Sequence, residues 1–291
     1  MGGTTGRARD GFDHRRFVAG LGRGVGGALL FALPMFLTME MWALGFYMDR
    51  FRLLVLLVVT IPLLIVLSDR IGFEKTAGWR EALRDASIAY AIGILSSAIV
   101  LAIAGILVPG DHPDATLGKI ALSSVPASIG ALLGRSQLDA GDGGDDSDGQ
   151  GDGQGDGGVR ETRYGEELFM MAVGALFLAL NVAPTEEMIL VSYKMSFWHA
   201  LAMMALSIVL MHGFVYAVSF KGSPSIGDGT PGWHAFIRFT LPGYVIATLI
   251  SLYCLWTFER LGGVAPTQVL MSVAILNLPG AIGAASARLI L

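Results

Sequence analysis

Long apolar stretches alternate with short polar ones along most of this 291-residue chain. Eight apolar stretches stand out, at about 25–47, 53–67, 86–108 and 120–133 in the first half and about 168–191, 197–219, 239–258 and 268–285 in the second. A helix needs roughly 20 apolar residues to cross a bilayer, and several stretches reach that length. The pattern predicts an all-α polytopic membrane protein with about eight transmembrane helices. Trp79, in the polar segment 68–85, suits a helix at the membrane interface.

A polar segment at 136–160 separates the two sets of four stretches. It consists mainly of Gly, Asp, Gln and Ser, and it contains seven aspartates. This composition buries too little apolar surface to offset the entropy lost on ordering, so we expect a disordered linker. A calcium loop is the alternative, but the segment lacks the closing glutamate of an EF-hand. The expected organisation is a flexible basic arm at 1–22, a four-helix repeat at 23–135, the linker, and a second four-helix repeat at 161–291.

Three motifs occur twice in the same order, which indicates an internal duplication. Thr38-x-Glu40-Met41 recurs as Thr185-x-Glu187-Met188, 147 residues later. The second motif, Gly78-Trp79-x4-Arg84, recurs 154 residues later as Gly232-Trp233-x4-Arg238. The third motif, Pro126-x2-Ile129-Gly130-Ala131-x3-Arg135, recurs 153 residues later as Pro279-x2-Ile282-Gly283-Ala284-x3-Arg288. The offset changes only where loops lie, as expected for two copies of one unit. The small residues after each proline should allow close helix packing.

The basic residues predict the orientation of the two copies. If all eight stretches cross the membrane and the N-terminus is cytoplasmic, fifteen Lys and Arg lie on the cytoplasmic side and five on the other. The positive-inside rule favours this arrangement. If 120–133 and 268–285 were only re-entrant, the halves would be inverted and the count would be twelve to eight. We therefore expect parallel repeats in a bacterial inner membrane, with both termini and the linker in the cytoplasm.

Composition supports the membrane assignment and excludes several classes of function. The chain is 53% hydrophobic and 15% charged, with a mean hydropathy of +0.61. The net charge of −4 comes from the linker aspartates, and the rest is modestly basic. The chain lacks the alternation of basic and aromatic residues that would indicate nucleic-acid binding. Its single cysteine, Cys254, excludes disulfides within the chain and cysteine-based zinc sites. The expected partners are the lipid bilayer and a small cation or proton. We expect no cofactor, and a homo-oligomer is compatible with the sequence.

The candidate chemistry is concentrated in two acids inside apolar stretches. Glu40 and Glu187 hold matching positions, and an ionisable group in hydrocarbon costs on the order of several kcal/mol, so each marks a functional site by default. A proline in a helix frees the carbonyl four residues earlier, which would gather oxygens near these acids. Such oxygens suit protons or hard cations. The predicted ion-pathway residues are Glu40, Glu187, Glu186, Thr38, Thr185, Asn181, Pro34 and Pro184; Glu40 and Glu187 would bind a metal cation if one is carried.

With these two acid-containing motifs, the chain resembles a bacterial family described only as integral membrane proteins, over about residues 20–291. The resemblance implies a membrane protein and no particular activity. The stretch Pro184-Thr185-Glu186-Glu187 also resembles the ion sites of duplicated cation exchangers, whose repeats each pair a proline with an acid. The first copy departs from that pattern, because Met35 follows Pro34.

Three classes of function stay open. A cation or proton transporter or channel is favoured, because the acid recurs. An intramembrane hydrolase is an alternative, since the acids at 186–187 with His199 and His212 resemble prenyl-protein-type membrane proteases. That pattern has Arg where this chain has Val191 and Asn where it has Tyr216. In the third class, a scaffold or sensor, protonated acids would only hydrogen-bond between helices. The sequence favours ion transport without enzymatic activity.

Overall fold

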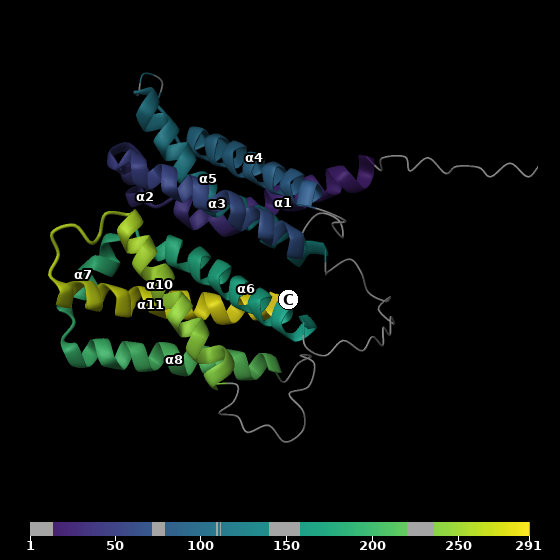
Figure 1. Cartoon of the computed structure of the whole chain (residues 1–291). Coiled ribbons are helices and arrows are strands. Elements are labelled where there is room, and N and C mark those ends of the chain that lie inside the picture. Colours follow the sequence, from purple (N-terminus) through teal and green to yellow (C-terminus); the bar gives the residue numbers. More distant parts are fainter. Residues whose placement is uncertain are drawn as a thin grey trace, which may run out of the picture.

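The computed structural model describes residues 14–71, 79–108, 110, 112–139, 158–219 and 236–290. Within these ranges all regular structure is helical (Figure 1). The first half of the molecule consists of α1 (His14–Phe36), α2 (Met39–Tyr47), α3 (Arg50–Ile71), α4 (Trp79–Ile103) and α5 (Pro113–Asp139). The second half consists of α6 (Gly158–Val182), α7 (Glu186–Lys194), α8 (Phe197–Ser219), the π-helix η1 (Phe236–Thr240), α10 (Leu241–Thr257) and α11 (Pro266–Ile290).

Six of the described helices are long and apolar enough to cross a bilayer, and the bent pair α1–α2 would make a seventh. The six include Pro113–Gly134 of α5 and Pro266–Ala287 of α11, which are longer than the sequence stretches suggested. In α8 the shorter segment Phe197–Gly213 is apolar. The prediction of an all-helical membrane protein is confirmed, whereas the number of eight complete spans is not.

The apolar stretches at 25–47 and 168–191 are not the continuous helices that we expected. The axis bends by 83° between α1 and α2, and α6 ends four residues before α7 begins. The interfacial helix expected around Trp79 is also corrected, because Trp79 is the first residue of α4, with 70% of its surface exposed. Helix α1 begins at His14, so residues 14–22 are helical rather than part of a flexible arm.

Some of the sequence predictions concern residues outside the described ranges. They are the arm at 1–13, the linker at 140–157, and Gly78, Gly232 and Trp233 of the second repeated motif. The two ends of the predicted linker at 136–160 are corrected, because residues 136–139 belong to α5 and residues 158–160 belong to α6.

The long helices lie side by side and alternate in direction (Figure 1). Helices α1, α4, α6 and α10 run towards one end of the molecule, and α3, α5, α8 and α11 run back. The short helices α2 and α7 lie together at the first of these ends, on the left in Figure 1. We call it the α2–α7 end. Helix α5 ends and α6 begins at the opposite end.

Each half is closed by a contact between its first and last helix, made at glycines. A Cβ atom added to Gly27 of α1 would stand closer than 3.0 Å to the backbone of Gly130 and Gly134 of α5. A Cβ atom added to Gly174 of α6 would meet the backbone of Gly283 of α11 equally closely. The prediction of close packing at Gly130 and Gly283 is thus confirmed. Helix backbones can approach this closely only where no side chain intervenes.

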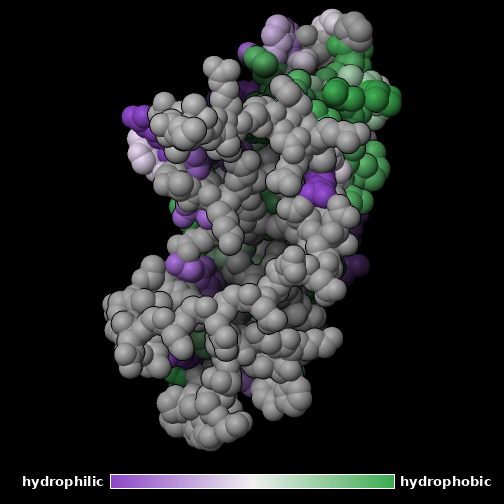
Figure 2. All heavy atoms as spheres, turned by 90° about the vertical axis from the view of Figure 1, so that its right-hand side faces the viewer, coloured by the Kyte–Doolittle hydropathy of each residue, from purple (hydrophilic) through white to green (hydrophobic). Residues whose placement is uncertain are grey.

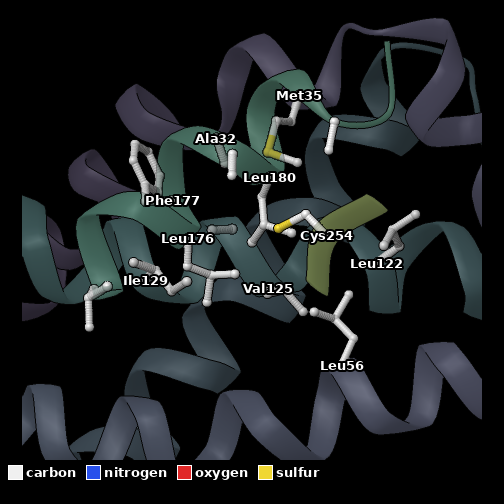
Figure 3. Close-up of a cluster of buried hydrophobic side chains, with 14 of the residues drawn as sticks. Ala32, Met35, Leu56, Leu122, Val125, Ile129, Leu176, Phe177, Leu180 and Cys254 are labelled. Atoms are coloured by element: carbon white, nitrogen blue, oxygen red, sulfur yellow. The ribbon is translucent and has the colours of Figure 1, made fainter. Parts of the chain in front are cut away.

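The two halves share one apolar core, shown in Figure 3. Phe31 of α1 and Phe177 of α6 meet edge to face across the boundary, with ring centroids 5.4 Å apart. Around them, α1, α3, α5, α6 and α10 contribute fully or nearly fully buried side chains, among them Ala32, Met35, Leu56, Val125, Leu180 and Cys254. Apolar side chains therefore line the boundary between α1 and α6 at this level.

A polar contact joins the halves at the α2–α7 end. The backbone N–H of Asp49 donates to a carboxylate oxygen of Glu259 at 2.8 Å. Arg52 of α3 donates to the carbonyl of Trp256, and its guanidinium lies 5.3 Å from the centre of the Trp256 ring. We call these four residues the polar clasp.

The outer flanks of the molecule are apolar. Large exposed side chains include Leu54 and Val58 of α3, Leu95 and Ile99 of α4, and Trp198 of α8. Figure 2 looks onto the end opposite the α2–α7 end; hydrophobic side chains gather along one flank of the upper, first half. Such flanks are suited to contact with lipid.

Candidate ion-pathway site

The two helix breaks have the same hydrogen bonds. In the first, Thr38 donates its backbone N–H (3.3 Å) and its hydroxyl (2.9 Å) to the carbonyl of Met35. In the second, Thr185 donates its N–H (3.1 Å) and its hydroxyl (2.8 Å) to the carbonyl of Val182. Thr185 follows Thr38 by 147 residues, and Val182 follows Met35 by the same 147 residues that separate Glu40 from Glu187. The same local turn thus stands before Glu40 and before Glu187.

The local sequence explains why both helices stop. Pro34 lies in the last turn of α1 and Pro184 in the turn after α6, and each removes a backbone donor. Thr38 and Thr185 then occupy the cap positions of α2 and α7 with extended backbone, but neither side chain caps the new helix. Their hydroxyls satisfy the preceding turn instead. The hydropathy of the two stretches cannot report this, because the residues at each break are largely apolar.

The break places three acids in the first turns of α2 and α7. Glu40 is half-buried in α2, whereas Glu186 and Glu187 are exposed in α7. We expected Glu40 and Glu187 inside continuous helices; they instead lie in the first turns of short helices, and they differ in burial. The positive end of a helix dipole favours a carboxylate in the first turn. This is one physical reason why acids are tolerated at both positions.

The carbonyls at the breaks are already bonded to protein donors. The indole N–H of Trp42 donates to the carbonyl of Phe36 at 2.7 Å. The guanidinium of Arg260 donates to the carbonyl of Pro184. These two carbonyls are not the ones four residues before Pro34 and Pro184, so the gathering of freed oxygens near the acids stays a prediction.

Arg260 also makes the two breaks electrostatically unequal. It brings a positive charge to the second break, beside the helix that carries Glu186 and Glu187. Ile106 holds the corresponding position in the first half, 154 residues earlier. Among the described residues, no hydrogen bond or ion pair joins Glu40, Glu186 or Glu187 to another side chain. Helix α2 packs on α5 and α7 packs on α11, so each acid belongs to a short helix that contacts the last helix of its own half.

Asn181 and the histidines do not join the acids. The Asn181 amide donates to the carbonyl of Phe177 within α6, at 2.7 Å. His199 Nδ1 lies 2.8 Å from the hydroxyl of Ser196, and His212 Nδ1 lies 3.0 Å from the hydroxyl of Thr240. In the part of the chain that the structure describes, no three His, Cys, Asp or Glu side chains converge as metal ligands would.

A buried acid, Asp85, escaped the sequence analysis. It is 1% exposed at the start of α4, with one carboxylate oxygen 3.6 Å from the Arg84 Nε. It stands directly before an apolar stretch, so we assigned it to the polar segment. Its helical spacing from Ala82 and Ala89 could have indicated its burial, because all three residues lie on the same buried face of α4.

A row of polar side chains along α11 was also missed. Gln268 donates to the hydroxyl of Ser192 at 2.6 Å, and Ser272 reaches the same hydroxyl at 3.2 Å. Deeper along the helix, the buried amide of Asn277 donates to Thr248 of α10 at 2.9 Å. The spacing of Gln268 and Ser272, four residues apart, could have shown one polar stripe in this apolar stretch.

Comparison with known protein families adds one finding. Residues 20–291 match the family described as Putative integral membrane protein (DUF2391). The chain belongs to this family. The match confirms the resemblance drawn from the motifs and makes the protein a multi-pass integral membrane protein in contact with the lipid bilayer. No curated protein and no solved structure matches the chain.

Proposed function

We propose that the protein moves a small cation or protons across the membrane, as a transporter or gated channel, with Glu40 and Glu187 coordinating the ion or carrying the proton. The observation that supports this is the repeated break, an identical turn followed by an acid in two helices. Interrupted helices are typical of ion and substrate sites in transporters, because they bring helix ends and unpaired backbone groups to one place.

The proposal includes a parallel duplication of the two halves. Three sets of contacts support it, with offsets close to those of the motifs. The turns differ by 147 residues, and the glycine contact of Gly27 with Gly130 corresponds to that of Gly174 with Gly283. The ends of α4 and α10 also agree, because the N–H groups at 104–106 and at 258–260 bond to matching carbonyls. Parallel halves place both termini on one side, for which the basic residues favour the cytoplasm of a bacterial cell.

The closed apolar boundary favours a mechanism that involves movement. Phe31, Phe177 and the buried side chains of Met35 and Leu180 make the boundary between α1 and α6 apolar. A hydrated ion entering from the α2–α7 end could pass the boundary only if the helices separated. A carrier that alternates its access, or a channel with a closed gate, has this property.

Within this scheme the first break is the main exchange site. Glu40 is half-buried, and Arg260 places its charge at the other break. A fixed cation beside α7 lowers the affinity of that region for a mobile cation by Coulomb repulsion. No catalytic role is assigned to His199 or His212, since each is bonded to a hydroxyl on or beside the membrane helices.

Ion flux into proteoliposomes tests the proposal, with a panel of monovalent and divalent cations and a pH gradient. Glu40→Gln keeps volume and hydrogen bonding but cannot ionise, so we expect flux to fall roughly tenfold or more, equivalent to about 1.4 kcal/mol in barrier height. Glu187→Gln should reduce flux less. Asp114→Asn is the matched control, because Asp114 is an exposed acid in the first turn of α5. Flux that is unchanged in both Gln variants would make the acids structural, and no flux for any ion would favour a scaffold or sensor.

A further inference from the structure

A hollow of about 690 Å³ lies beside the first break, at the α2–α7 end. Helix α2 forms one wall with Trp42, Ala43 and Phe46. The turn after α4 contributes Ile106, and the first turns of α5 contribute Lys119. The volume is within the roughly 300–1,000 Å³ of pockets that hold small molecules. It is large enough for a lipid headgroup and part of one acyl chain.

The hollow combines an apolar wall with basic side chains. Lys119 is half-buried, and its ammonium group donates to the carbonyl of Ile106 at 3.1 Å. The guanidinium of Arg50 is held over the junction of α2 and α5, where it donates to the carbonyls of Phe46 and Asp114 at 3.3 Å each. The exposed His112 also lines the hollow. Two permanent positive charges are therefore fixed at or next to an apolar cleft.

Exposed apolar side chains also lie at and beside the hollow. Leu37, Met39, Phe46 and Tyr47 are each more than half exposed along the first break and α2. Aromatic side chains such as Trp42 and Tyr47 are typical of the level at which headgroups meet hydrocarbon. The hollow thus opens where a phospholipid can enter from the bilayer without leaving it.

We propose that this hollow binds an anionic phospholipid from the leaflet at the α2–α7 end. The phosphate lies at Lys119, and an acyl chain lies along Trp42 and Phe46. Basic pockets between membrane helices are known to recognise anionic headgroups. A free anion would leave the apolar wall unused, and a zwitterionic lipid would gain little from the fixed positive charges.

Thermal unfolding of the purified full chain in detergent tests this, with added phosphatidylglycerol or with phosphatidylcholine of the same chain length. We expect phosphatidylglycerol to raise the melting temperature more than phosphatidylcholine. Lys119→Met should raise roughly tenfold the phosphatidylglycerol concentration that gives half of the full rise in melting temperature, because one charge-assisted hydrogen bond is lost. Lys194→Met is the matched control, since Lys194 is an exposed lysine on α7 at the same end.

A second variant tests the apolar wall separately from the charge. Ala43→Phe places a ring in the hollow and keeps Lys119, so we expect the stabilisation by phosphatidylglycerol to be lost. Retention of phosphatidylglycerol in native mass spectra provides an independent readout for wild type and variants. Equal stabilisation by both lipids, an equal loss in Lys119→Met and Lys194→Met, or an effect of inorganic phosphate as large as that of the lipid would overturn the proposal.

Discussion

At Glu259 the backbone passes through the left-handed region, with φ of 61°. A side chain in that conformation costs on the order of 1 kcal/mol relative to glycine. Gly105 has the corresponding position in the first half, with φ of 71°. In both halves the helix ends with the same pair of backbone hydrogen bonds, from residues 105 and 106 and from residues 259 and 260. Glu259 thus retains a costly conformation, and its carboxylate bonds to Asp49 across the polar clasp.

This balance predicts different effects on stability for two substitutions of Glu259. Glu259→Ala removes the hydrogen bond to Asp49 but keeps the backbone cost, so we expect a loss of about 1 kcal/mol in the free energy of unfolding. Glu259→Gly removes both and should be nearly neutral. Unfolding in an SDS titration measures the difference. Gly105→Ala is the control for the backbone alone, because no atom lies within 4 Å of the added Cβ; a variant as stable as wild type would show that the left-handed cost is negligible here.

At the residue scale the sequence identified the acids but not their surroundings. A charge in an apolar stretch is visible in any hydropathy profile, so Glu40 and Glu187 were found. Their different burial depends on where each helix breaks, and the positive charge at the second break comes from Arg260, which lies 73 residues beyond Glu187 in the chain. Asp85 was missed for the opposite reason, because its burial comes from helix packing rather than from its neighbours in sequence.

At the scale of elements, the glycine contacts decide how closely α1 approaches α5 and α6 approaches α11. Gly27→Ala should destabilise the protein by about 1–3 kcal/mol, because the new methyl group meets backbone atoms that cannot rotate away. Gly174→Ala should do the same in the second half. The free energy of unfolding in SDS provides the measurement.

Controls for the glycine variants lie on the same helices. Gly22 of α1 and Gly165 of α6 have open space around an added Cβ. Alanine at either position should be neutral or stabilising by up to about 1 kcal/mol, since alanine favours the helix. If Gly27→Ala were as stable as Gly22→Ala, the close contact would contribute nothing to stability.

The helices themselves could largely be predicted, because apolar length is sufficient to predict a membrane helix. The breaks could not. Pro34 and Pro184 suggested kinks, but proline alone is tolerated within membrane helices, and Pro62, Pro126 and Pro279 lie inside α3, α5 and α11. The breaks also include the Thr38 and Thr185 hydroxyls, which turn back to the preceding carbonyl. Whether a threonine hydroxyl bonds to the preceding carbonyl or caps the next helix depends on tertiary contacts, which one stretch of sequence does not contain.

At the scale of the whole molecule, the polar clasp is the hydrophilic contact described between halves that otherwise meet through an apolar boundary. If transport requires the halves to separate at the α2–α7 end, linking them there should stop it. We expect a short bis-maleimide between cysteines at Asp49→Cys and Glu259→Cys to abolish ion flux. The buried Cys254 should not react, because the reagent does not reach it.

Each single cysteine variant, treated in the same way, is the control for loss of the side chain itself. This matters for Asp49, whose carboxylate accepts a hydrogen bond from the Arg52 N–H at the start of α3, at 3.0 Å. Flux that continues at the wild-type rate in the linked double variant would contradict movement of the halves at this end and favour a fixed pore.

The closure of each half through its own glycines also bears on how the protein is made. The ribosome completes α5 before any part of α6 leaves its exit tunnel, and α5 is the helix against which α1 packs most closely. The first five helices make most of their contacts with one another, so they can pack in the bilayer while the rest is still being translated. The order of synthesis then coincides with the order of assembly, and the later helices arrive at a partner that is already folded.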